Sequence, residues 1–165
     1  ASNFLATAHR ARVQGAWCEK PLATNEYDLI KLRALATKKM PVQVNFWRAF
    51  IPEVATTAAQ IRGGMFGKNH HATGYYAGNF VENGVHVLAL AQSCLGPLSL
   101  VHSDTNRSSG NPLTMVQTAS GSMLVCAPIP RQKYNIFELD ILCEDSRIRF
   151  VANGRRIEIQ HLQFL

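Results

Sequence analysis

Residues 16–26 read AWCEKPLATNE, a stretch in which an apolar run meets a charged turn and then the start of a helix. Residues 16–18 form a short apolar run, which is typical of a buried strand. The acidic residues from Glu26 onward are typical of a first helical turn. Between them, the charged pair and proline at 19–21 neither extend a strand nor suit the interior of a packed helix. Such a turn can hold a cation in place, and Lys20 is therefore the first candidate for a functional role.

Helix and strand patterns alternate on both sides of this turn. Residues 4–15 predict a helix that ends at its last glycine, and residues 26–39 predict another, capped by Thr24 or Asn25. The apolar residues 41–47 predict a second strand, and strands separated by a helix are typical of a parallel sheet. The apolar stripe of the second helix is expected at Tyr27, Ile30, Ala34 and Leu35.

The pattern changes near residue 47, where we expect a boundary between an α/β segment and an α+β segment. Residues 51–64 predict a helix with proline near its start, 70–78 a strand and 83–96 a further helix. Strand patterns separated by turn residues follow at 97–104, 113–119, 122–129, 136–144, 146–153 and 155–162. Apolar and acidic residues alternate in the fourth of these, which is typical of a sheet with one buried and one polar face.

The composition argues against several classes of protein. The net charge is +6, but the 17 Lys and Arg residues are scattered without a basic, aromatic-rich face, so we expect no nucleic-acid binding. The most apolar run, residues 85–101, contains histidine, glutamine and a Gly-Pro break and is not a membrane span. The 4 cysteines form no CxxC pair, which predicts reduced, mostly buried thiols in a cytoplasmic protein and no zinc site.

Two further motifs carry little weight. RGGMFGKN at 62–69 lacks the spacing of a phosphate-binding loop and follows a helix instead of a strand. His70 and His71 are adjacent, so on a strand they point to opposite faces and cannot hold one metal together. We therefore expect no metal centre.

Glu82 and His86 form a more informative pair. They are four residues apart at the start of an apolar helix, and they share one face if the helix begins by residue 82. A carboxylate beside an imidazole orients it and raises its basicity, as a general base requires. The alternative is a structural pair that ties the preceding strand to the helix, and the pair alone does not decide between the two.

An ordered series of motifs links the charged turn to this pair. It consists of CEKPLA at 18–23, VQVNFWRAF at 42–50, IRGGMFG at 61–67 and GNFVENGVH at 78–86, with a strand-rich tail after them. Over nearly the whole chain, the series resembles the sugar and polyol dehydrogenases of the glucose–fructose oxidoreductase and inositol dehydrogenase family. The resemblance implies α/β plus α+β architecture: the C-terminal remnant of a Rossmann domain over 1–47, then a mostly antiparallel open-sheet domain for substrate binding and oligomerisation over 48–165.

The resemblance also implies catalytic roles for Lys20, His86 and Glu82. Lys20 resembles the active-site lysine at the end of a Rossmann strand, close to the nicotinamide and to the substrate hydroxyl. His86 resembles the histidine that takes the hydroxyl proton as hydride leaves, and Glu82 stands where the family usually carries an aspartate that orients it. These residue types suit alcohol oxidation, which needs a base for the proton and a cation near the developing alkoxide.

Binding residues and partners follow from the same resemblance. The residues implied for the cofactor, NAD or NADP, are Glu19, Lys20, Pro21 and Asn45. Those implied for a sugar or polyol substrate are Lys20, Arg48 and His86. The resemblance further implies a homodimer or higher homo-oligomer that forms through the open face of the sheet.

One departure from the family qualifies the expected function. The glycine-rich GxGxxG turn that supports the cofactor's pyrophosphate does not occur in the sequence. We therefore expect a truncated NAD(P)-dependent oxidoreductase of sugars or cyclitols that keeps its catalytic residues and little of its cofactor site. The alternative is a non-catalytic relative that binds a sugar or nucleotide as a sensor or scaffold.

Overall fold

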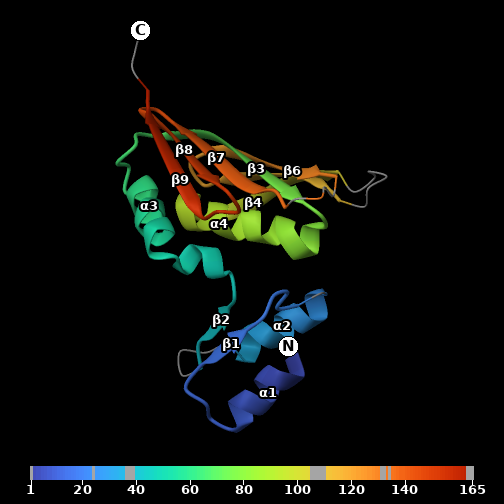
Figure 1. Ribbon diagram of the computed structural model, residues 1–165. Coiled ribbons are helices and arrows are strands. Elements are labelled where there is room, and N and C mark those ends of the chain that lie inside the picture. Colours follow the sequence, from blue (N-terminus) through green and yellow to red (C-terminus); the bar gives the residue numbers. More distant parts are fainter. Residues whose placement is uncertain are drawn as a thin grey trace. The chain divides into compact units, whose positions relative to one another are not determined.

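The structure is a computed structural model that describes residues 2–23, 25–35, 40–104, 111–130, 133 and 135–162. The chain forms two compact units, residues 1–46 and 47–165, and each is described by itself (Figure 1). Of the predicted features, Thr24 and the end of the second helix at 36–39 lie outside the described residues.

The first unit is a small α/β unit. Its elements are α1 (Ser2–Arg10), β1 (Ala16–Cys18), α2 (Glu26–Leu35) and β2 (Val42–Val44). β1 and β2 pair in parallel, with Ala16 opposite Val42 and Cys18 opposite Val44, which confirms the predicted parallel sheet. The buried core consists of Leu5, Cys18 and Leu32, packed against partly buried neighbours.

Both helices of this unit differ from the prediction. The first was expected to end at Gly15, but α1 ends at Arg10 and the left-handed residue after it is Arg12, with φ 56°. The predicted apolar stripe of α2 was wrong at Tyr27 and Ile30, which are 67% and 61% exposed, whereas Leu35 does pack against the core, whose buried residue on this helix is Leu32. Apolar residues occur on every side of α2, so their spacing did not select one face.

The cap of α2 does follow from the sequence. The Asp28 backbone N–H donates to Asn25 Oδ1 at 2.8 Å, which satisfies one of the free N–H groups of the first turn.

The second unit is a seven-stranded sheet with two helices. Along the chain, η1 (Trp47–Phe50) and α3 (Pro52–Arg62) precede the first strand of this sheet, and η2 (Phe80–Gly84) and α4 (Val85–Leu95) lie between its first and second strands. The strands are β3 (Asn69–Ala77), β4 (Leu98–Asp104), β5 (Leu113–Thr118), β6 (Met123–Ile129), β7 (Phe137–Cys143), β8 (Ser146–Val151) and β9 (Arg156–His161). Their order is β4-β5-β6-β3-β7-β8-β9, and every pair is antiparallel except β3 with β6. The fold class predicted from the sequence is therefore confirmed.

The core of this unit lies between the sheet and α4 (Figure 1). β7 directs Phe137, Leu139 and Ile141 into it, and all three are at most 1% exposed. The alternation of apolar and acidic residues thus predicted the buried face of this strand correctly. Helix α3 packs against α4 and adds Val54, Ala58 and Ile61.

Gly74 sets how closely α4 approaches the sheet. A Cβ atom at this position of β3 would overlap Cγ1 of Val87, which is fully buried in α4. The approach therefore depends on the missing side chain and not on an unusual backbone.

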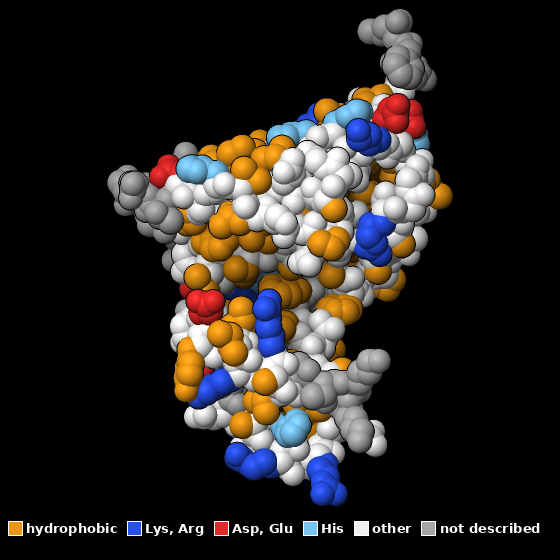
Figure 2. Space-filling view, turned by 180° about the vertical axis from the view of Figure 1, so that it is seen from behind, with side chains coloured by type: hydrophobic (Ala, Val, Ile, Leu, Met, Phe, Trp, Pro, Cys, Tyr) orange, Lys and Arg blue, Asp and Glu red, His pale blue; other side chains and the backbone are white. Residues whose placement is uncertain are grey.

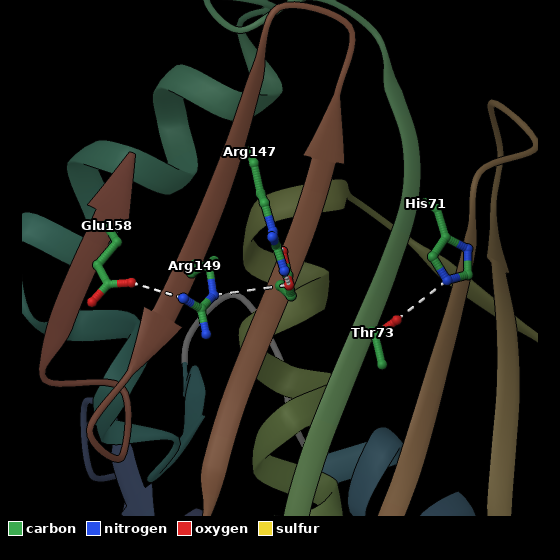
Figure 3. A network of polar contacts seen from close by, with 6 residues as sticks. His71, Thr73, Arg147, Arg149 and Glu158 are labelled. Carbon is green, nitrogen blue, oxygen red and sulfur yellow. Dashed lines mark hydrogen bonds and ion pairs between the residues drawn. The ribbon is translucent and has the colours of Figure 1, made fainter. Parts of the chain in front are cut away.

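The other face of the sheet is open and carries an ion-pair network. Arg147 of β8 donates to Asp140 of β7 through Nη2 at 2.5 Å and Nε at 3.0 Å. Arg149 donates to Glu158 of β9 at 3.0 Å, and its Nε lies 3.9 Å from Asp140 (Figure 3). Asp140 thus neutralises two guanidinium groups of β8, and Glu158 pairs with one of them.

A shallow hollow of about 380 Å³ lies on the same open face. It is lined by His71, Thr73, Asp140, Leu142, Arg147, Gln160 and Leu162. Thr73 Oγ1 lies 3.2 Å from His71 Nε2 on its β3 wall (Figure 3).

In the rear view of Figure 2, Lys and Arg side chains lie apart from one another among hydrophobic and polar ones, in line with the scattered charge of the sequence.

The substitution Gly74→Ala tests the close approach of α4. The added methyl group would force α4 away from β3, so we expect the free energy of unfolding to fall by about 1–3 kcal/mol, the usual cost of overpacking. Urea unfolding measures this loss. The cost should shrink in a Val87→Ala background, which removes the opposing Cγ1, and equal costs in both backgrounds would contradict the account.

Candidate active site

The charged turn lies at the edge of the parallel pair in the first unit. β1 ends at Cys18 and β2 at Val44, so the residues that follow each strand emerge at the same edge. The Asn45 backbone N–H donates to Cys18 O at 2.8 Å, and Asn45 Nδ2 donates to Glu19 Oε1 at 2.6 Å. The structure thus brings together Glu19 and Asn45, which the sequence analysis assigned to the cofactor.

A hollow of about 350 Å³ opens beside this turn. It is lined by Phe4, Trp17, Cys18, Glu19, Lys20 and Pro21, and the peptide bond between the last two is cis. Phe4 and Trp17 are both 62% exposed, which leaves two aromatic side chains next to a lysine and a carboxylate. Neither aromatic residue was predicted as a site residue, although Trp17 lies only two residues before the charged turn.

A set of asparagine contacts fixes the turn that leads to His86 in the second unit. Asn79 accepts a hydrogen bond from the Glu82 N–H at 2.7 Å, as an N-cap does. Asn83 Nδ2 donates to Ala77 O, while Asn111 donates to Gly78 O and accepts from the Phe80 N–H. These contacts hold the chain between β3 and α4 in one conformation.

The predicted pairing of Glu82 with His86 meets an unexpected geometry. Residues 80–84 form a π-helical turn and not the first turn of an α-helix. The α-helical start from which the pairing was predicted is therefore not present at residue 82, and the pairing itself stays a prediction. Glu82 is exposed, whereas His86 is buried in the first turn of α4 with 8% of its surface exposed.

Gly84 makes this turn possible. A Cβ atom at Gly84 would lie 2.5 Å from the Phe80 ring, which packs edge-on against Tyr76 at 6.1 Å between centroids. The glycine thus lets the aromatic ring close the turn directly before His86.

Arg48 has a closely packed cation in the second unit. Its guanidinium lies between two rings, with Cζ 4.6 Å from the Trp47 centroid and 3.9 Å from the Phe137 centroid. Its Nε donates to Asn153 O at 2.9 Å. Burial, followed by the nearby charge of Arg155, lowers the pKa of Arg48 below its usual value, and only 9% of the residue is exposed.

The hairpin between β8 and β9 is shaped to receive Arg48. Ala152, Asn153 and Gly154 all have positive φ, at 52°, 62° and 76°. A Cβ atom at Gly154 would lie 3.1 Å from Arg48 Cδ and 3.3 Å from the Phe137 ring. The sequence indicated a turn at Asn153-Gly154, but nothing in it linked this turn to a residue more than a hundred positions earlier.

The predicted site residues therefore fall into two sets. Glu19, Lys20, Pro21 and Asn45 belong to the first unit, and Arg48, Glu82 and His86 to the second. Glu19, Lys20 and Pro21 of the first set border a hollow with exposed aromatic rings, and the second set contains a buried histidine and a buried arginine.

The cysteines have no part in either set of predicted site residues. All four are free and buried, as expected, and burial raises the pKa of Cys94 and Cys126 to about 12, so these two remain protonated thiols at neutral pH. Within the described ranges, no group of His, Cys, Asp and Glu could hold a metal ion. None of the helices described is long and apolar enough to cross a membrane.

Comparison with known proteins gives matches at the level of structure. The sequence matches no family model and no curated protein. Levoglucosan dehydrogenase in complex with NADH and levoglucosan superposes with a TM-score of 0.81 at 17% identity, over 97% of this chain and 54% of that one. The WlbA dehydrogenase of Bordetella pertussis, in complex with NADH and UDP-GlcNAcA, gives 0.79 at 16% identity, over 99% and 60%.

A third structure agrees with these two. An inositol dehydrogenase homologue from Azotobacter vinelandii, complexed with NADH and myo-inositol, gives a TM-score of 0.75 at 15% identity, over 97% of this chain and 52% of that one. The chain thus spans between about half and three-fifths of the length of these neighbours. Over the part that it shares with them, the chain has the fold of oxidoreductases of the glucose–fructose oxidoreductase and inositol dehydrogenase type.

Proposed function

We propose that this chain is part of an NAD(P)-dependent oxidoreductase that transfers a hydride between a nicotinamide cofactor and a hydroxyl-bearing carbon of a sugar-like or polyol substrate. The observation that carries the proposal is the position of Lys20, at the carboxyl edge of two parallel strands and beside a hollow. The likeness to dehydrogenases solved with NADH or NAD⁺ supports it.

The residues around the hollow fit a nicotinamide group. Phe4 and Trp17 offer exposed aromatic faces against which a planar ring can stack. The Glu19–Asn45 pair offers polar groups to a carboxamide, and Lys20 lines the same hollow as Glu19. Pro21 shapes the same turn. These residues would hold the ring end of the cofactor in the first unit.

The proposed chemistry divides between Lys20 and His86. His86 accepts the proton of the substrate hydroxyl at a ring nitrogen while the C–H bond of the same carbon breaks, so that the alcohol becomes a carbonyl. Lys20 stabilises the negative charge that develops on the oxygen. A bound nicotinamide supplies the hydride acceptor. Glu82 orients His86 or supports its charge, and Arg48 contributes to the substrate site.

We also propose that the protein is a cytoplasmic homodimer that forms through the open face of the sheet. Tyr75 and Leu142 on this face are 39% and 42% exposed, and covering such apolar surface is favourable by about 25 cal/mol per Å². The ion pairs around Asp140 are already satisfied within the chain, so they can enter an interface without leaving a charge unpaired.

Two substitutions test the division of roles. Removing the base in His86→Ala should lower kcat by about 10²–10⁴-fold, and Lys20→Ala should lower it by about 10²–10³-fold through the lost charge stabilisation. Nicotinamide reduction is followed spectrophotometrically with a panel of sugars and polyols. Because the chain is shorter than its structural neighbours, the longest product of its reading frame is assayed beside it.

Lys31→Ala is the matched control for these variants. Lys31 lies on the surface of α2, over the Tyr27 ring and away from the hollow. It should leave kcat unchanged. Substrate-dependent turnover that survives both Lys20→Ala and His86→Ala would reject the proposed roles, and nucleotide binding without any turnover would favour the sensor interpretation.

Leu142→Arg tests the proposed dimer. The new arginine would be buried in an apolar contact with no charged partner, so the dimer should dissociate into monomers. Light scattering after gel filtration measures the molar mass that shows this change. Leu100→Arg is the control, since Leu100 is 68% exposed on the edge strand β4 but pairs with Val116 of the buried face. A monomeric mass for the unmodified protein would refute the proposal.

A further inference from the structure

Arg48 differs from the arginines of the open sheet face, because no carboxylate among the described residues forms an ion pair with it. Arg147, Arg149 and Arg156 each form an ion pair with Asp140 or Glu158. Arg48 is more deeply buried than any of them, yet its described contacts are two aromatic rings and one backbone carbonyl. A buried cation normally has an anionic partner, because desolvation of an uncompensated charge is costly.

The geometry leaves one edge of this guanidinium open to a ligand. Nε is engaged by Asn153 O, and no described protein group accepts from the two Nη atoms. They are also not among the fully buried polar atoms of the described residues that lack a partner, so they keep contact with solvent. Two parallel N–H groups of this kind match the two oxygens of a carboxylate or phosphate.

A second cation lies close by. Arg155 follows the hairpin that receives Arg48, and its charge acts unfavourably on that of Arg48. No described ion pair neutralises Arg155, whereas the adjacent Arg156 is paired with Glu158 at 2.8 Å. Two neighbouring cations without a described counter-charge create a local positive potential that an anion would relieve.

We propose that Arg48 and Arg155 form an oxyanion-binding site, which takes a carboxylate or phosphate group carried by a sugar-like ligand. The sugar-like part of this assignment rests on the proposed function, whereas the oxyanion part rests on the two arginines. The ring sandwich holds the guanidinium in one orientation before the ligand arrives, so little side-chain entropy is lost on binding. The site would make the protein select acidic sugars over neutral ones.

Isothermal titration of the chain with glucuronate, glucose 6-phosphate and glucose tests this site without any cofactor. At least one of the two anionic sugars should bind about tenfold or more tightly than glucose, as expected for a charge-assisted bidentate contact. Whichever anionic sugar binds more tightly identifies the oxyanion: glucuronate indicates a carboxylate, and glucose 6-phosphate indicates a phosphate. Equal affinities for all three sugars, or no binding of any of them, would overturn the proposal.

Substitutions then locate the effect. Arg155→Gln should remove part of the preference for the anionic sugar, and Arg156→Gln should leave it intact, since Arg156 is equally basic and exposed but already paired. Arg48→Lys keeps the positive charge but loses the two parallel N–H groups, so it should abolish most of the preference for the anionic sugar. Circular dichroism and thermal unfolding of this variant report whether it folds. A preference that survives Arg155→Gln and a folded Arg48→Lys would also overturn the proposal.

The test separates this site from the proposed enzyme activity. If the chain binds anionic sugars but never reduces a nicotinamide, the oxyanion-site proposal stands and the dehydrogenase proposal fails. If the chain oxidises neutral sugars with no preference for acidic ones, the dehydrogenase proposal stands and the oxyanion-site proposal fails.

Discussion

The packing of α4 against β3 at Gly74 and Val87 is the contact on which the second unit depends. The sheet buries one face only because α4 covers it, and α4 can approach only because residue 74 has no side chain. His86 directly precedes Val87, so the contact that closes the core also fixes where the histidine lies. The π-helical turn and its asparagine contacts fix the chain on the other side of the same residue. The position of the proposed base therefore depends on the same packing that closes the core.

The first unit places its polar residues by strand pairing. Because β1 and β2 are parallel, Glu19 and Asn45 emerge side by side although they are far apart in sequence, and a hydrogen bond joins them. Lys20 follows directly and borders a hollow with exposed aromatic rings. This is the edge at which open α/β sheets usually bind ligands. The roles of these residues remain proposals that rest on the family resemblance.

Sequence patterns predicted the long and strongly periodic elements well. The alternation in β7 showed which face was buried, and the proline at the first position of α3 marked its start. They failed where several local arrangements fit equally well. Apolar residues surround α2, so no single face could be chosen, and α1 ended several residues before the glycine that was expected to end it. The π-helical turn before α4 was missed because its sequence also fits an α-helical start.

The setting of Arg48 was beyond prediction for a different reason. Its partners Phe137 and Asn153 meet it only through the tertiary fold, and a single sequence carries no signal for such contacts. The charged turn, in contrast, stood out locally because its residues suit neither a strand nor a helix interior. Sequence thus identified Lys20 and His86 as candidates, while the stacked arginine and the aromatic hollow required the structure.

The most direct test of a nicotinamide site in the first unit uses Trp17 as the reporter. The chain contains 2 tryptophans, and Trp47→Phe leaves Trp17, which lines the hollow beside Lys20. Titration of this variant with NADH should quench Trp17 fluorescence along a saturating curve, with matching energy transfer to the reduced nicotinamide. Quenching that rises linearly without saturation and without energy transfer would contradict the claim that this hollow receives a nicotinamide cofactor.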